Sequence, residues 1–153
     1  PDIPLLTGMM LRSIYETALH YGFSYNDDEE KRFILLLIQG AMTHGERLEQ
    51  VNEELNFFME HGSFPQEEKM EELIRNTAGI LSDELLYMKF LQGIPIAGVI
   101  GGAEDAVYMS RINEYARLKY HRRFCLGRQN GMRSNEKKDI ETGERMNHAK
   151  EPE

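Results

Sequence analysis

The sequence predicts an all-α protein, a compact bundle of five or six helices around a buried central helix at residues 33–42. Apolar residues recur at spacings of three and four along most of the chain, which is the period of a helix face. No stretch alternates apolar and polar residues over the length of a strand. Segment 33–42 is apolar on all its faces, so other elements have to surround it.

Composition indicates a single globular domain. The chain has 153 residues, enough for a sizeable core, and its apolar and charged fractions are ordinary. A net charge of −8 argues against a nucleic-acid partner. Cys125 is the single cysteine, which excludes an internal disulfide and indicates a reducing, cytoplasmic compartment. Because the chain begins with Pro1, we expect it to be a fragment or a processed product.

The first helix is expected from Ile3 to Tyr21. Asp2 can cap it, Pro4 fits its first turn, and Gly22 suits the position after its end. Its core face is expected to consist of apolar residues spaced four apart: Leu6, Met10, Ile14 and Ala18.

The central segment follows a run of four acids at 27–30, which favours a helix N-terminus through the helix dipole. Periodicity alone does not distinguish a buried strand from a buried helix over Phe33–Ile38. The acidic start and the continuation to Met42 favour a helix.

Two further helices are expected at 46–60 and 66–78, separated by a break at 61–65. The first has an apolar face of Leu48, Val51, Leu55 and Phe58. The second repeats that pattern with Met70, Leu73, Ile74, Thr77 and Leu81. Ser82–Glu84 indicates either a new helix or a bend in one long helix.

A long helix is expected from about 97 to 126, after Gly93 and Pro95 interrupt the chain. Its inward stripe is expected to be Met109, Ile112, Ala116, Tyr120 and Phe124. Residues 128–153 contain few large apolar side chains, too few to offset the entropy of ordering. The predicted organisation is therefore a domain at 1–127 and a disordered polar tail at 128–153.

The glycine-rich segment 93–103 is uncharged and leads into that last helix. Gly98 and Gly102 are four apart, so on a helix they share a face that another backbone or a ligand can approach closely. This glycine face is consistent with tight packing against another helix and equally with docking of a membrane or a partner protein. The uncharged runs 33–45 and 90–103 are shorter than the roughly 20 residues of a spanning helix.

Charge is segregated along the chain. Residues 46–72 contain nine acids against Arg47 and Lys69, whereas 111–128 contain six basic residues against Glu114. Aromatic residues alternate with the basic ones, a pattern that suits anionic lipid headgroups. The acidic region can equally be a solvated face, and the two regions can attract each other within the fold.

No catalytic signature is present. His44 and Glu46 place a nitrogen and a carboxylate close together, and Asp105 follows the glycine pair at 101–102. A zinc site needs three or four ligands, and Asp105 can instead cap a helix. No metal or cofactor is therefore expected, and these three residues are only candidates for one.

Several short motifs resemble the EcsC family of bacterial proteins over about residues 1–126. They comprise Asp2-Ile3-Pro4, Tyr21-Gly22, Asp28-Glu29, Ile94-Pro95, Gly98, Gly101-Gly102, Ala116, Tyr120, Arg123 and Phe124. Many members have Asn where this chain has Asp105, which puts an amide-specific role at that position in doubt.

The resemblance implies an additional glycine-rich portion upstream and an operon encoding an ABC transporter, connected with protein secretion and competence. It implies no catalytic residues. Our first interpretation is a non-enzymatic accessory protein, cytoplasmic and peripheral at the inner face of the membrane. The residues expected to bind an anionic membrane or transporter subunits are Gly98, Gly101, Gly102, Arg117, Lys119, Tyr120, Arg122 and Arg123.

The alternative interpretation is a hydrolase or metal-dependent enzyme whose site the upstream portion completes. A further expectation concerns helix 33–42, which needs partners around its full circumference. Its uncovered part is expected to be covered by the upstream portion, by a second copy in a homodimer, or by lipid.

Overall fold

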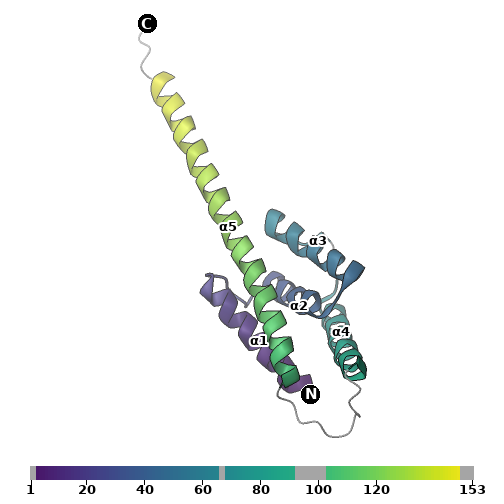
Figure 1. Ribbon diagram of the computed structural model, residues 1–153. Coiled ribbons are helices and arrows are strands. Elements are labelled where there is room, and N and C mark those ends of the chain that lie inside the picture. The colour runs from purple at the N-terminus through teal and green to yellow at the C-terminus, as the bar shows by residue number, and fades with distance from the viewer. Residues whose placement is uncertain (1–2, 66–67, 92–102, 149–153) are drawn as a thin grey trace.

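The computed structural model describes residues 3–65, 68–91 and 103–148, which form five α-helices (Figure 1). Within these ranges no strand occurs, so the predicted all-α class is confirmed. The helices are α1 (Ile3–His20), α2 (Asp28–Met42), α3 (Gly45–His61), α4 (Met70–Leu91) and α5 (Ala103–His148).

The predicted central position of α2 is confirmed. Every residue from Phe33 to Met42 is buried except Leu35, which is partly buried. The four other helices all contact α2, and α1 also packs along α5. Because α2 is apolar around its circumference, the bundle forms by placing helices on several of its sides at once.

The core face and the end of α1 follow the sequence pattern. Leu6, Met10, Ile14 and Ala18 are all at most 1% exposed. Gly22 has a φ of +81°, and the amide of Phe23 donates to the carbonyl of Ala18 at 2.9 Å. This left-handed closing turn is the reason for a glycine at that position.

Helices α3 and α4 pack on α2 through part of the predicted apolar faces. On α4, Leu73, Thr77 and Leu81 are buried, whereas Ile74 is 51% exposed. Val51, Leu55 and Phe58 of α3 are buried, and Gly62, with a φ of +78°, ends the helix. α4 begins at Met70 instead of 66, and it continues without interruption through Ser82–Glu84. The structure thereby decides for one long helix at that point.

The buried stripe of α5 differs from the predicted one. Tyr108, Ile112, Ala116 and Tyr120 are buried, whereas Met109 is partly buried and Phe124 is 39% exposed. Residues four apart on a helix advance by about 40° beyond one full turn. Over the four such steps from Tyr108 to Phe124 the row therefore turns off the packed face, and Phe124 lies at the rim beside Tyr21.

Helix α5 does not end near Leu126 but continues to His148, so it projects from the bundle (Figure 1). The segment expected to be a disordered tail is thus helical as far as 148. It has no proline before Pro152, and its charged and long polar residues are compatible with a helix. Residues 127–142 are exposed throughout, so they add nothing to the core, as their composition predicted.

Gly40 sets how closely α2 and α5 approach each other. A Cβ placed on Gly40 would lie 2.5 Å from Cζ and 2.6 Å from Cε1 of Tyr115. The Tyr115 hydroxyl donates to Oδ1 of Asn52 at 2.8 Å, which fixes the ring across the glycine. Burial raises the pKa of Tyr115, consistent with an enclosed hydroxyl.

We therefore predict that Gly40→Ala destabilises the protein by about 1–3 kcal/mol, because the rigid ring cannot yield without moving a helix. Chemical denaturation measures this. Gly8→Ala in α1 is the matched control, since a Cβ there meets nothing within 4 Å; the higher helix propensity of alanine should leave that variant at least as stable as wild type. If the two variants are equally stable, the space between Gly40 of α2 and the Tyr115 ring of α5 is large enough for a methyl group.

Candidate functional site

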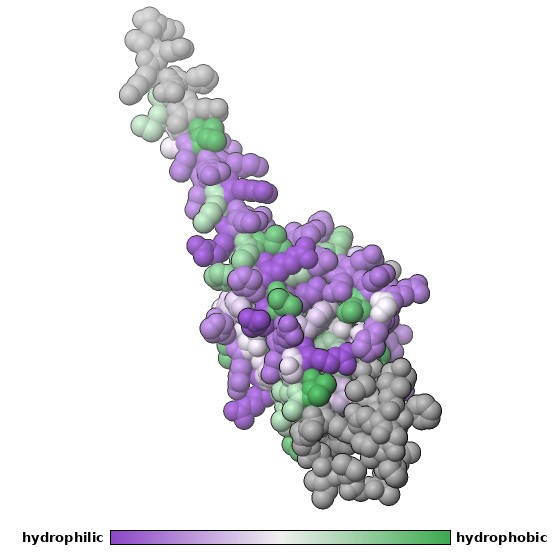
Figure 2. Space-filling model, in the orientation of Figure 1, coloured by the Kyte–Doolittle hydropathy of each residue, from purple (hydrophilic) through white to green (hydrophobic). Residues whose placement is uncertain are grey.

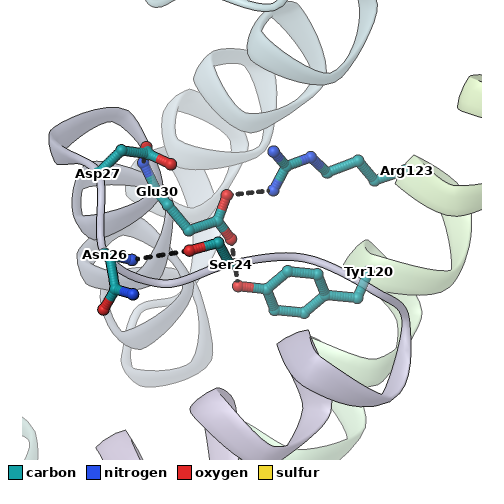
Figure 3. Close-up of polar contacts among 6 residues, drawn as sticks. All are labelled: Ser24, Asn26, Asp27, Glu30, Tyr120 and Arg123. Carbon is teal, nitrogen blue, oxygen red and sulfur yellow. Dashed lines mark hydrogen bonds and ion pairs between the residues drawn. The ribbon is translucent and has the colours of Figure 1, made fainter.

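The basic part of α5 was the predicted binding surface, but the structure places Tyr120 inside the bundle. Its side chain is fully buried, and its hydroxyl donates to Oε1 of Glu30 at 2.7 Å (Figure 3). Burial raises the pKa of Tyr120, and the negative charge of Glu30 raises it further. Tyr120 is therefore part of the core, and its side chain is not available to contact a membrane surface.

Arg123 takes part in the same buried cluster. Its Nη1 donates to Oε2 of Glu30 at 2.6 Å, and its side chain is only 18% exposed (Figure 3). The guanidinium carbon lies 4.2 Å from the ring centroid of Phe23 and 4.9 Å from those of Phe33 and Phe58. An arginine enclosed by a carboxylate and three aromatic rings holds α5 against α2 and α3.

Glu30 is the residue of this cluster that sequence reasoning missed. It was assigned to the acidic first turn, yet it is 2% exposed. Asp27 performs the capping role instead, accepting from the amide of Glu30 at 2.7 Å. A signal was present, because Glu30 stands three and seven positions before Phe33 and Leu37 and so shares their buried face.

Arg122 binds the acidic helix α3. Its guanidinium donates to Oδ1 of Asn56 at 2.7 Å and contacts Oε1 of Glu60 at 3.4 Å. The acidic and basic regions therefore do attract each other within the fold at this point. Because both side chains are about half exposed, this ion pair contributes little stability.

Arg117 and Lys119 do not form one surface with these residues. Arg117 is exposed, whereas Lys119 is partly buried with its Nζ 5.4 Å from the centroid of the Tyr115 ring. Residues two apart on a helix point to different sides. Burial, and to a lesser extent the charge of Arg122, lowers the pKa of Lys119 to about 8. The predicted residues Gly98, Gly101 and Gly102 lie outside the described residues.

The candidate metal ligands are not brought together. His44 and Glu46 are exposed, and Nε2 of His44 lies 3.5 Å from Nη2 of Arg111, a cation that would repel a metal ion. The side chain of Asp105 lies outside the described residues. In the part of the chain that the structure describes, no three His, Cys, Asp or Glu side chains are arranged to hold a metal ion.

An apolar groove of about 380 Å³ opens between α1, α2 and α4. It follows the side of α2 at Leu35, which is covered only in part, and Ile74 of α4 at its edge is 51% exposed. The sequence anticipated this uncovered part because helix 33–42 is apolar on all faces. The lining residues are Thr7, Leu11, Tyr15, Lys31, Ile34, Leu35, Ile38, Met70, Ile74, Thr77, Ala78 and Leu81.

A polar cleft of about 460 Å³ lies beside α2, on the side of α3 and α4. The buried amide of Gln39 donates to Oγ1 of Thr77 at 2.9 Å and accepts from Nη2 of Arg47 at 2.9 Å. Glu54 also lines the cleft, and burial raises its pKa, with Arg47 opposing and Glu68 adding to the shift. Sequence analysis did not single out this cleft, since its residues come from three helices.

Residues 1–124 match the model of the EcsC protein family. The chain belongs to the EcsC family. The match covers the helical bundle and stops before the projecting part of α5. No curated protein and no solved structure matches the chain.

Within this EcsC chain, no described helix combines the length and the apolar character needed to cross a membrane. The family match covers residues 1–124, and the motif resemblance covers about residues 1–126. Two residues of those motifs, Tyr120 and Arg123, bind Glu30 inside the bundle.

We predict that Arg123→Met destabilises the protein by about 3–5 kcal/mol, because it leaves the carboxylate of Glu30 buried without its cation. Denaturant unfolding measures this, and Arg122→Met is the control. Arg122 is of the same type and adjacent but half exposed, so its loss should cost less than about 1 kcal/mol. The double variant Glu30→Met with Arg123→Met should recover part of the stability lost in Arg123→Met. If Arg123→Met and Arg122→Met lose equal stability, Arg123 is not the cation that compensates the buried carboxylate of Glu30.

The pKa of Lys119 predicts a pH dependence of stability. The folded pKa is about 8 and the ordinary value is 10.5, so between them the unfolded chain binds a proton that the folded chain does not. Stability from this group therefore rises as the pH increases through that window. The stability of wild type relative to Lys119→Met should increase between about pH 7.5 and about pH 9.5, because the variant lacks this titration.

Lys137→Met, which alters an exposed lysine of the same helix, should track wild type over that range. A constant difference between wild type and Lys119→Met would mean that Lys119 keeps its ordinary pKa.

Proposed function

We propose that the chain is a non-enzymatic accessory protein of the EcsC type that works peripherally at the inner face of the cell membrane, in connection with an ABC exporter and protein secretion. The observation that carries this proposal is membership of the EcsC family over 124 of the 153 residues. The operon context that the family resemblance implies supplies the exporter and the secretion role.

The apolar groove supports the membrane contact. It exposes side chains of three helices on one uncovered side of α2, where a soluble monomer would ordinarily place polar residues. We assign lipid of the bilayer surface as its occupant. Ile74 is the groove residue best suited to a test, since it is half exposed and a polar replacement leaves the core intact.

We therefore expect wild type to co-sediment with vesicles of phosphatidylglycerol and phosphatidylethanolamine, and Ile74→Glu to bind several-fold less. A buried carboxylate at the lipid contact is costly, which is the physical reason for the loss. Leu19→Glu is the matched control. Leu19 is an apolar residue of similar exposure (57%) on α1 that does not line the groove, so its replacement should leave binding unchanged.

The same pair of variants tests the exporter connection. Tagged wild-type protein and Leu19→Glu should co-purify from bacterial membranes with the ATPase or the membrane subunit encoded in the operon, and Ile74→Glu should not. If all three proteins stay in the supernatant with vesicles and with membranes, the peripheral role is wrong. If the two glutamate variants lose binding equally, the groove is not the contact.

A further inference from the structure

The projecting part of α5, residues 127–148, extends beyond the helical bundle (Figure 1). The whole helix has 46 residues, which corresponds to roughly 69 Å at 1.5 Å per residue. All residues from 127 to 142 are exposed, and the projecting arm is mostly hydrophilic with isolated apolar residues (Figure 2). A single helix in water is marginally stable even with favourable residues.

The arm contains charged and long polar residues that favour a helix, but several of its other residues do not. Gly127 and Gly131 lie inside it, and glycine is among the weakest helix formers. Asn130, Ser134 and Asn135 add further residues of low propensity. Local propensity therefore does not explain this helix, and packing against another helix would.

A seam for such packing runs along the outward side of α5. Leu118, Cys125, Met132 and Met146 are separated by seven residues or a multiple of seven, so they lie on nearly the same side of the helix. All are exposed, with Leu118, Met132 and Met146 at 55%, 57% and 61%. Asp139 occupies the remaining position of this repeat.

Charges beside the seam change sign along the helix. Three and four residues from the seam positions, the proximal half has His121, Arg122 and Arg128 with one acid, Glu114, and the distal half has Glu136. Asp139 on the seam adds a second distal acid. Lys137 and Lys138 are near them in sequence but point to other sides of the helix.

We propose that the projecting half of α5 pairs with the same helix of a second copy in antiparallel orientation, centred on Met132. In this register Met132 contacts the partner's Met132, and Leu118 contacts the partner's Met146. Arg128 lies at the height of the partner's Glu136, so opposite charges meet. In a parallel pair the basic half of each helix would face the basic half of the other, and the two Asp139 side chains would face each other. Repulsion between these like charges disfavours that arrangement.

The seam offers only a few apolar residues per copy, and its other positions are polar. The pair is therefore weak and concentration-dependent, and the arm loses helicity as the protein is diluted. This inference does not depend on the proposed function, because the groove lies on α1, α2 and α4.

Disulfide trapping tests the register. Antiparallel pairing about Met132 places Cys125 opposite the partner's Asp139, since both are seven residues from the centre. Asp139→Cys should therefore form a covalent dimer under mild oxidation at least several-fold faster than wild type, whose two Cys125 thiols are about 21 Å apart along the axis. Lys138→Cys is the matched control on another side of the helix, and it should react slowly.

Adding Cys125→Ser to Asp139→Cys should abolish the rapid cross-link. Sedimentation at increasing concentration should show wild type approaching twice the monomer mass, and Met132→Lys should remain monomeric. Equal trapping of Asp139→Cys and Lys138→Cys, or fastest trapping of wild type, would overturn the antiparallel register. A monomer at every concentration whose helicity rises only with vesicles would assign the seam to lipid and overturn the pairing.

Discussion

The fold depends on one constraint, which is that residues 33–42 of α2 are apolar around the circumference of the helix. A helix on the outside of a bundle needs only one buried face, whereas α2 needs neighbours on all sides. The chain provides α3 and α4 on one part of it and α1 and α5 on another. The groove between α1, α2 and α4 is where this enclosure is incomplete. The same constraint thus produces both the core and the surface to which we assign a function.

Within this apolar surrounding, Glu30 is the exception that links α2 to α5. A carboxylate at 2% exposure is tolerated because Tyr120 and Arg123 both donate to it. The aromatic rings around Arg123 provide a further favourable contact for its guanidinium. The cluster fixes the position of α5 at one point, and the close approach of Gly40 to Tyr115 fixes it at another.

The division of the basic residues of α5 changes the functional interpretation. A row of cations beside aromatic rings is the usual pattern of a lipid-binding helix, but here two of those cations bind Glu30 and Glu60 within the chain. We assign the proposed membrane contact to the apolar groove, which is lined by residues of α1, α2 and α4. In this EcsC family member, the candidate contact therefore lies on these three helices and not on the basic part of α5.

The sequence by itself determined the class of the fold, the identity of the central helix and the limits of α1, α2 and α3. Each of these depends on local information: the apolar period, the capping residues and the glycines that take a left-handed conformation at the helix ends. The core positions of α1 could be read directly for the same reason, since Leu6, Met10, Ile14 and Ala18 follow one simple spacing.

Tertiary structure alone decided which charges are internal and which are available. Glu30 and Arg123 are 93 positions apart, and no local pattern states that they meet. Residues of like appearance in the sequence, such as Arg117 and Arg123, have different roles because the side of the helix on which each lies is set by packing. Likewise, the groove was foreseeable as uncovered apolar surface, but its place between α1 and α4 follows from where those helices pack. A charged group on the surface is solvated by water, whereas a buried one needs a specific partner in the protein. Which groups are buried is decided only when the helices pack into the bundle.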